Sequence, residues 1–212
     1  MYIALGTCPD IAYAVSRLSC FLDCFHIEHW NVAIHIVHYL KGTCTLPLVL
    51  GGDAIQLIRF TDSDYANDPD NRHSIGGYCF TLGAGMISWS SCKQRIITDS
   101  STAAEYIAAS ESSHKCVWLH ALLIGLGIPQ PLPTPILCNN NSAINLSNDQ
   151  VFHTCAKHID VHWHSLCERV EDCDLVLSRV HGTDNTADVF TKPLTAPAFT
   201  RLRTFLGLHL SA

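Results

Sequence analysis

The sequence predicts an α/β fold with a mixed five-stranded sheet, whose first three strands are antiparallel, flanked by helices. Three apolar runs, Leu57–Asp62, Tyr78–Leu82 and Met86–Ser90, follow one another, and glycines between the last two indicate a hairpin turn. A long helical pattern over Thr102–Leu126 comes next, and strand and helix patterns alternate after it. Consecutive strands followed by strand–helix alternation are typical of a mixed sheet covered by helices.

The segment before the first strand predicts an N-terminal helical region. Residues 8–42 contain two stretches with apolar side chains at helical spacing, and Pro9 lies near the start of the first. The second stretch, His29–Leu40, ends at Gly42. The apolar run Leu46–Leu50 predicts a short strand.

Beyond the long helix, two further strands and four helices complete the predicted fold. Gly127 and a proline-rich loop end the long helix. The expected elements after it are strands Ile136–Cys138 and Leu175–Val180 and helices Ser142–Leu146, Ala156–Val170, Asp184–Lys192 and Pro197–Leu206.

Composition favours a globular protein and excludes several classes. Of the 212 residues, 48% are hydrophobic and only 15% are charged, which argues against disorder. No apolar run is long enough to cross a membrane, and the N-terminus lacks a signal-peptide layout, so we expect an intracellular protein, cytoplasmic or nuclear and not secreted. The 11 cysteines include no Cys-x-x-Cys pair, so the common zinc-finger patterns are absent.

Four positions stand where an α/β sheet could bring them to one edge. Asp62 ends the first central strand, Glu105 lies in the first turns of the long helix, Asn139 follows the fourth strand, and Asp188 lies early in a late helix. Carboxylates gathered in this way can hold two divalent cations for phosphodiester hydrolysis. An acid at such a position is far more often a turn residue or a helix-terminal charge than a metal ligand, so the residues by themselves predict only a candidate carboxylate site.

A series of motifs over nearly the whole chain resembles the C-terminal end of a copia-type LTR retrotransposon Pol polyprotein. Two motifs resemble the tail of its reverse transcriptase, and the others resemble its RNase H domain in the same order. The first two are Thr-Cys-Pro-Asp-Ile-Ala-Tyr-Ala-Val-Ser-Arg-Leu-Ser at residues 7–19 and His-Tyr-Leu-Lys-Gly-Thr at residues 38–43. The others are Phe60-Thr-Asp-Ser-Asp-Tyr-Ala, Ser74-Ile-Gly-Gly-Tyr, Ile87-Ser-Trp-Ser-Ser, Ser100-Ser-Thr-Ala-Ala-Glu-Tyr, Ser142-Ala-Ile, Lys157-His-Ile-Asp and Ala187-Asp-Val-Phe-Thr-Lys-Pro-Leu.

The resemblance implies an RNase H-like domain over residues 54–194 that acts on the RNA of RNA–DNA hybrids. Residues 1–50 would be a remnant of the C-terminal (connection) region of the reverse transcriptase, and residues 195–212 a helical tail. Asp62, Glu105 and Asp188 match the family's metal-binding acids, which implies Mg²⁺ in a two-metal site, with Mn²⁺ as a substitute. The resemblance also implies a partner in the upstream reverse transcriptase region of the ancestral polyprotein. It implies no contact with a membrane.

One catalytic position departs from the family pattern. Where the family has Cys-Asp-Asn after the fourth strand, this chain has Cys138-Asn139-Asn140, so an amide replaces a catalytic carboxylate. An amide offers one neutral acceptor oxygen in place of two charged ones. Only three of the four catalytic positions then carry a carboxylate, and we expect cleavage to be impaired. The alternative is a non-catalytic nucleic-acid-binding or structural remnant of a decayed element.

A small basic cluster follows the third strand. Lys93 and Arg95 could contact the phosphate backbone of a hybrid, because phosphate contacts are made mainly by Lys and Arg. The opposing interpretation is a solvated hairpin end. A net charge of −6 gives no general basic footprint, so nucleic-acid contact depends on such local clusters and on bound metal.

Overall fold

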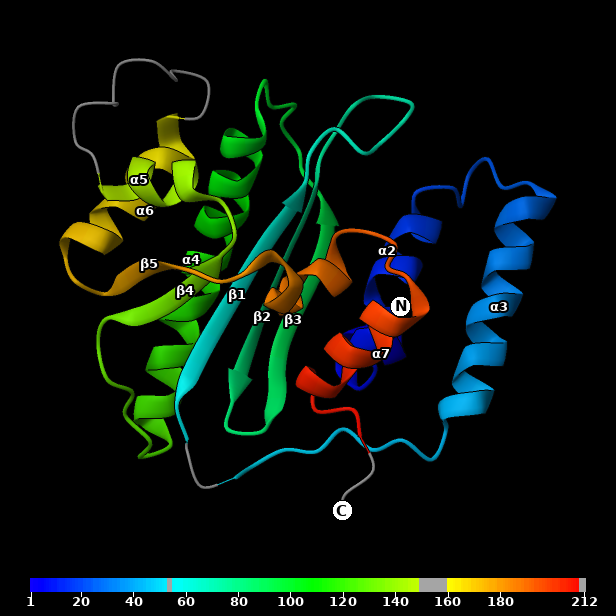
Figure 1. The fold of residues 1–212 in the computed structure, drawn as a ribbon, viewed down its shortest axis with the longest axis horizontal. Coiled ribbons are helices and arrows are strands. Elements are labelled where there is room, and N and C mark those ends of the chain that lie inside the picture. Colours follow the sequence, from blue (N-terminus) through cyan, green and yellow to red (C-terminus); the bar gives the residue numbers. More distant parts are fainter. Residues whose placement is uncertain (53–54, 149–159, 210–212) are drawn as a thin grey trace.

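The computed structural model describes residues 1–52, 55–148 and 160–209, and its centre is a five-stranded sheet in the order β3-β2-β1-β4-β5 (Figure 1). The strands are β1 Leu57–Asp64, β2 Ile75–Leu82, β3 Gly85–Lys93, β4 Thr134–Cys138 and β5 Leu175–Arg179. Strands β1, β2 and β3 pair antiparallel, while β4 runs parallel to both β1 and β5. The predicted mixed sheet with three antiparallel strands is therefore confirmed.

Helices cover both faces of the sheet (Figure 1). On one side lie α4 Ser101–Gly125, α5 Asn141–Asn148 and α6 Asp160–Glu171. On the other lie α1 Tyr2–Gly6, α2 Ala12–Ser19, α3 Ile27–Thr43 and α7 Ala196–Phe205. The described residues also form the short 3₁₀-helices η1 Pro9–Ile11, η3 Gly182–Asp184 and η4 Thr186–Phe190.

The long helix α4 forms the main core with one face of the sheet. The Ser100 side chain caps its N-terminus by accepting a hydrogen bond from the Ala103 amide. The buried core between the helices and the sheet includes Phe80, Ile107 and Ile136. Burial of these apolar side chains fixes α4 against β1 and β2, and so fixes the position of the helix N-terminus.

A second apolar cluster joins the two ends of the chain across the other face of the sheet. It contains Cys79 and Met86 of the sheet, Phe190 of η4 and Leu202 of α7, with Ala12 of the N-terminal region. The Trp89 indole, which faces the same side, donates a hydrogen bond to the Ala4 carbonyl at 2.7 Å. The N-terminal helices are therefore packed onto the sheet together with the C-terminal helix.

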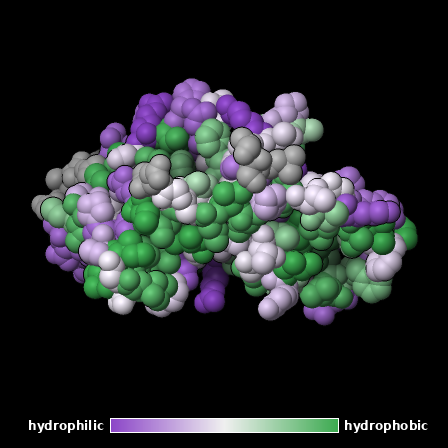
Figure 2. All heavy atoms as spheres, turned by 90° about the horizontal axis from the view of Figure 1, so that it is seen from below, coloured by the Kyte–Doolittle hydropathy of each residue, from purple (hydrophilic) through white to green (hydrophobic). Residues whose placement is uncertain are grey.

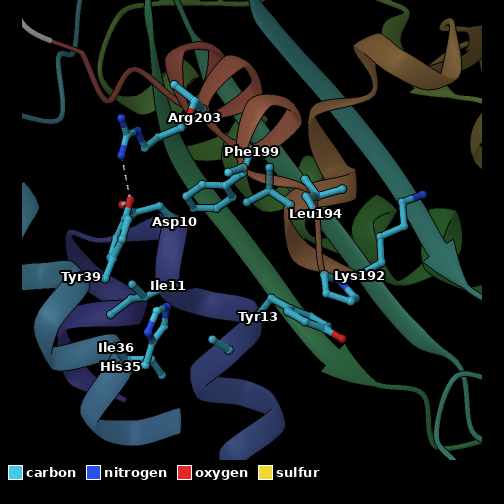
Figure 3. Close-up of a pocket in the computed structure, with 15 residues that line it drawn as sticks. Asp10, Ile11, Tyr13, His35, Ile36, Tyr39, Lys192, Leu194, Phe199 and Arg203 are labelled. Carbon is cyan, nitrogen blue, oxygen red and sulfur yellow. Dashed lines mark hydrogen bonds between the residues drawn. The ribbon is translucent and has the colours of Figure 1, made fainter.

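A cavity of about 510 Å³ lies at the seam between the N-terminal helices and the C-terminal segment (Figure 3). Its lining is mostly apolar and aromatic, as the Phe199 and Ile36 side chains show. At one end the Tyr39 hydroxyl donates to the Asp10 carboxylate and accepts from Arg203 at 3.2 Å. This chain of hydrogen bonds ties η1, α3 and α7 together.

The predicted strand Leu46–Leu50 is wrong. Only isolated bridges form here, between Leu48 and Leu208 and between Gly51 and Gly83. Pro47 has no amide hydrogen to donate, so the segment cannot form a continuous ladder. It is instead a connection that crosses the lower end of the sheet in Figure 1.

The predicted helix Asp184–Lys192 is also wrong, because this segment forms the two short 3₁₀-helices η3 and η4. The buried Asn185 side chain separates them: its amide donates to the Thr61 carbonyl at 2.9 Å, and its oxygen accepts from the Ala187 amide. A side chain that binds the backbone in this way competes with continuous helix formation. The remaining predicted elements are present with shifted ends, although residues 156–159 of one predicted helix lie outside the described residues.

The end of the molecule that carries the 44–56 connection has a largely hydrophobic surface (Figure 2). Exposed apolar side chains at this end include Leu50 in the connection, Leu126 after α4 and Leu132 before β4. Strands β1 and β4 both run away from it (Figure 1), so the polar residues at their carboxyl ends lie at the opposite end of the sheet. Among the described residues, no helix has the length and apolar character needed to cross a membrane.

Candidate carboxylate site

The parallel pairing of β1 and β4 brings the predicted site residues to one edge of the sheet. Asp62 lies near the end of β1 and is buried, and Asn139 follows directly after β4. Glu105 lies in the second turn of α4 and Asp188 in η4, and both are buried. The four positions that the sequence singled out therefore come from four different elements.

Asp62 is the residue that connects the group. Its Oδ1 accepts a long hydrogen bond of 3.4 Å from the Asn139 amide, and its Oδ2 accepts a short one from the Thr191 hydroxyl. Only 1% of the Asp62 residue surface is exposed. Because a buried carboxylate needs partners, these donors stabilise its charge. Asn139 therefore acts as a donor toward Asp62, which an aspartate could not do when ionised.

Lys192 provides the positive charge of the site. Its Nζ lies 3.0 Å from Asp188 Oδ1 and 3.5 Å from Asp62 Oδ2. The side chain begins at the edge of the cavity in Figure 3 and points away from the other residues that line it. The ammonium group therefore bridges two of the three carboxylates.

Burial and neighbouring charge perturb the protonation of the acids. Burial, followed by the Asp62 carboxylate, raises the pKa of Glu105 to about 9. The same two causes raise the pKa of Asp188 to about 7, against the opposing effect of Lys192. Burial alone would lower the pKa of Lys192, but the carboxylates of Asp62 and Asp188 raise it above its usual value. Three ionised carboxylates would carry more negative charge than Lys192 neutralises, and the raised pKa values of Glu105 and Asp188 reflect this.

The donor chemistry of the site fits a hard divalent cation. Carboxylate oxygens are the ligands that such cations take, and Glu105 Oε2 is buried with no hydrogen-bond partner. Within the described part of the chain, however, no group of three or more His, Cys, Asp or Glu side chains is close enough to hold a metal ion. The types of side chain therefore suit a divalent cation. In this structure, however, Asp62 is paired with Lys192 and Asn139, and Asp188 is paired with Lys192.

Sequence reasoning missed Lys192 and Thr191 as members of the site. Both occur in the Ala187–Leu194 motif, and Lys192 lies four residues after Asp188, a spacing at which opposite charges on a helical turn can meet. Asp68 is buried and pairs with Lys93 at 3.0 Å and with Arg17 at 3.7 Å.

The basic cluster after β3 is split by these contacts. The charge of Lys93 is paired with Asp68, whereas Arg95 is exposed to solvent. Gln94 between them is buried and donates to the Ala104 carbonyl at 2.8 Å. A role in nucleic-acid contact therefore stays a prediction for both basic residues, with Arg95 the more accessible.

Gly77 allows η4 to approach the sheet closely. It pairs with Asp62 across β1 and β2, and a Cβ at this position would lie 2.7 Å from Thr191 Cγ2 and 2.8 Å from Phe190 Cβ. We expect Gly77→Ala to lower the free energy of unfolding by about 1–3 kcal/mol, because the added methyl group must push η4 away. Urea unfolding measures this change.

The neighbouring Gly76→Ala variant is the control for Gly77→Ala. Its Cβ would meet Gln94 Nε2 at 3.3 Å, a milder contact than the two at Gly77. Equal destabilisation by the two variants would contradict the close approach of η4 to the strand.

The raised pKa of Glu105 predicts a pH dependence of stability in the absence of metal. The unfolded chain ionises this group near its usual pKa of 4.5, while the folded protein ionises it only near 9, so the folded state binds the extra proton between these values. Stability therefore falls as the pH rises through this window. We expect Glu105→Gln to gain several degrees in melting temperature relative to the unsubstituted chain between pH 5 and pH 9.

Thermal melts of both proteins in EDTA measure this gain. Glu168→Gln, which removes an exposed carboxylate of α6, is the control for the loss of a negative charge. A Glu105→Gln difference that stays constant with pH would contradict the buried, protonated Glu105.

Comparison with known proteins identifies relatives over nearly the whole chain. No family model matches it. The chain is 40% identical over 209 residues to the retrovirus-related Pol polyprotein from transposon TNT 1-94 of Nicotiana tabacum, which is 99% of this chain and 16% of that protein. It is 37% identical over 208 residues to the Pol polyprotein from transposon RE2 of Arabidopsis thaliana, or 98% of this chain and 14% of that protein. Thus the chain spans less than a fifth of the length of these relatives.

One solved structure aligns with part of this chain. The crystal structure of LC11-RNase H1 in complex with an RNA/DNA hybrid aligns with 64% of this chain and 94% of that one. The TM-score is 0.46 and the sequence identity is 16%.

Proposed function

This chain belongs to the family of retrovirus-related transposon Pol polyproteins, and we propose that it is the RNase H portion of such a polyprotein, with impaired activity. The observation that carries the proposal is the meeting of Asp62, Glu105, Asp188 and Asn139 at the carboxyl ends of β1 and β4. They occupy the positions of the family's catalytic motifs in the sequence. The proposed substrate is the RNA strand of an RNA–DNA hybrid.

The proposed cofactor is Mg²⁺, with Mn²⁺ as a substitute, held by Asp62, Glu105 and Asp188. When bound, divalent cations supply water activation and charge stabilisation for phosphodiester hydrolysis. Asp62 contributes from β1, where it contacts Asn139 as well as Lys192, and it is the natural shared ligand. Glu105 contributes the oxygen that has no hydrogen-bond partner.

The proposed impairment follows from the chemistry of Asn139. Three carboxylates bring a charge of −3 where a complete family site would bring −4. The Asn139 amide also donates to Asp62 Oδ1 and so occupies an oxygen that a cation needs. Lower metal affinity and slow cleavage are the expected consequences.

A second candidate is a protein that binds hybrids without cleaving them. It is favoured by the pairing of both Asp62 oxygens with groups of the chain itself, Asn139, Thr191 and Lys192. Arg95 after β3 is the proposed backbone contact, with Lys93 beside it. Binding through phosphates should weaken as salt concentration rises, which a titration of a labelled hybrid at several salt concentrations measures.

The domain boundaries remain part of the proposal. Residues 54–194 would be the RNase H portion, 1–50 the remnant of the reverse transcriptase connection region, and 195–212 its tail. The packing of Ala12 with Leu202 and Met86 supports a single folded unit made from all three segments. The upstream reverse transcriptase region is the proposed partner in the ancestral polyprotein.

The experiment that tests the function is cleavage of a labelled RNA–DNA hybrid in Mg²⁺ by the Asn139→Asp variant. The same variant carrying Asp62→Asn is the inactive control. Cleavage that needs neither Mg²⁺ nor Asp62, or that does not distinguish a hybrid from single-stranded RNA, would contradict the proposal.

A further inference from the structure

We propose that Lys192 is a built-in counter-ion of the carboxylate site and competes with divalent cations for Asp62 and Asp188. The inference rests on the proposed function, because it takes these carboxylates as the metal-binding group. It adds a regulatory contact within the chain, in which the ammonium group must leave before the carboxylates can close around an ion.

The first argument is the position of the ammonium group. Lys192 Nζ lies within 3.0 Å of Asp188 Oδ1 and 3.5 Å of Asp62 Oδ2, between oxygens that belong to different elements. A divalent cation shared by the two carboxylates would need the same oxygens. Because both cations draw on the same two oxygens and repel each other, each weakens the binding of the other.

The second argument is the charge of the three buried acids compared with the single positive charge of Lys192. Glu105, Asp62 and Asp188 are all buried, and Glu105 Oε2 has no hydrogen-bond partner. An ionised, buried carboxylate without a partner is costly, so holding all three acids as carboxylates requires more positive charge than one ammonium group provides. Lys192 contacts Asp62 and Asp188, and Glu105 Oε2 is left without a hydrogen-bond partner. This oxygen is therefore available to a further cation.

The third argument is the absence of a ready-made metal site in the described residues. Among the residues that the structure describes, no three His, Cys, Asp or Glu side chains lie close enough together to hold an ion. Three groups of the chain, the Lys192 ammonium, the Asn139 amide and the Thr191 hydroxyl, already engage Asp62. Displacing Lys192 removes its charge from Asp188 Oδ1 and Asp62 Oδ2 together, so that these oxygens can close with Glu105 Oε2 into a set of three carboxylate ligands while Thr191 still donates to Asp62.

Competition of this kind has a reciprocal thermodynamic consequence. If the ammonium group weakens metal binding by some factor, then bound metal weakens the ion pairs of Lys192 by the same factor. Coupling between two sites in proteins is typically about 5- to 150-fold in affinity. Removing the charge of Lys192 should therefore tighten metal binding by about tenfold or more.

The test is titration of Mn²⁺ alone, without nucleic acid, followed by electron paramagnetic resonance and calorimetry. The proteins are the unsubstituted chain, Lys192→Gln and Lys192→Arg. Lys192→Gln keeps a hydrogen-bond donor for Asp188 but removes the charge, and we expect its Mn²⁺ affinity to rise about tenfold or more. Lys192→Arg keeps the charge, so its affinity should stay close to that of the unsubstituted chain.

Lys93→Gln is the matched control. Lys93 also pairs with a buried aspartate, Asp68, at 3.0 Å, and its side chain is 31% exposed against 33% for Lys192. It lies outside the carboxylate site, so its loss should leave Mn²⁺ affinity unchanged. Melting temperatures with and without Mn²⁺ provide a second readout, in which Lys192→Gln should gain more from the metal than the unsubstituted chain does.

The outcomes separate this inference from the proposed function. Equal Mn²⁺ affinity of the unsubstituted chain and Lys192→Gln, or equal tightening by Lys192→Arg, overturns the counter-ion role while leaving the metal site in place. Mn²⁺ binding by none of the proteins, including Lys192→Gln, overturns the metal site itself. If Lys192→Gln folds only when metal is present, its melting temperature as a function of Mn²⁺ concentration still gives its Mn²⁺ affinity. Comparison of that affinity with the affinity of the unsubstituted chain then tests the counter-ion role.

Discussion

Asn139→Asp should raise the rate of Mg²⁺-dependent cleavage of an RNA–DNA hybrid by about 10²-fold or more, the usual effect of one key electrostatic group in an active site. The substitution replaces the amide that donates to Asp62 Oδ1 with a carboxylate that can share a cation with it. Because the position of the metal sets the geometry of both the attacking water and the leaving oxygen, restored binding acts on the rate directly. Initial rates at saturating hybrid, measured over a range of Mg²⁺ concentrations, give the effect.

Asn140→Asp is the matched control for this gain. It adds the same charge one residue later, and it keeps the cap of α5, because the Asn140 oxygen that accepts from Ser142 and Ala143 has a counterpart in aspartate. We expect no gain in cleavage from it. Equal activity of Asn139→Asp and the unsubstituted chain, or an equal gain from Asn140→Asp, would contradict the assignment of Asn139 as the defect.

Arg59→Met should raise the free energy of unfolding by about 1–4 kcal/mol, as replacement of a buried charge by an apolar side chain of similar shape does elsewhere. The Arg59 side chain is fully buried in β1, and all three guanidinium nitrogens lack hydrogen-bond partners. Burial lowers the pKa of Arg59 to about 10, which reflects the cost of keeping the charge there. Its stabilising contact is with the Phe80 ring, 5.8 Å from the guanidinium carbon.

Methionine suits this position because it is long, unbranched and apolar. Urea unfolding at neutral pH measures the gain, and Arg169→Met is the control. Arg169 makes a partly exposed ion pair with Asp174 at 3.0 Å, and loss of such a pair costs about 0–1 kcal/mol. Loss of stability on Arg59→Met would show that the guanidinium has a stabilising partner and contradict the description of the core.

The sheet was predictable because its strands have strong local signals. The apolar run of β1, the glycine turn between β2 and β3, and the alternation after α4 each depend on residues close in sequence. The start of β2 was missed because Gly76 and Gly77 have weak strand preference, and their place in the strand depends on the packing of η4 and α4 against them.

The candidate site was predictable only in part. The family motifs placed Asp62, Glu105 and Asp188 in order, and the parallel pairing of β1 and β4 brings Asn139 to the same edge. The Lys192 bridge could not be predicted, since it depends on the contact of η4 with β1, two segments far apart in sequence. Arg59 shares a face of β1 with Leu57, so the two-residue period places it in the core, but its lack of partners is a property of the packed structure.

The central claim is that the carboxyl ends of β1 and β4 form an RNase H-type site that lacks one carboxylate, at residue 139. The most direct measurement is anomalous diffraction from crystals of Asn139→Asp grown with an RNA–DNA hybrid and Mn²⁺. The account predicts manganese peaks in contact with Asp62, Glu105 and Asp188, and an RNA phosphate of the hybrid beside them. A hybrid bound elsewhere on the protein, or manganese absent from Asp62, would contradict it.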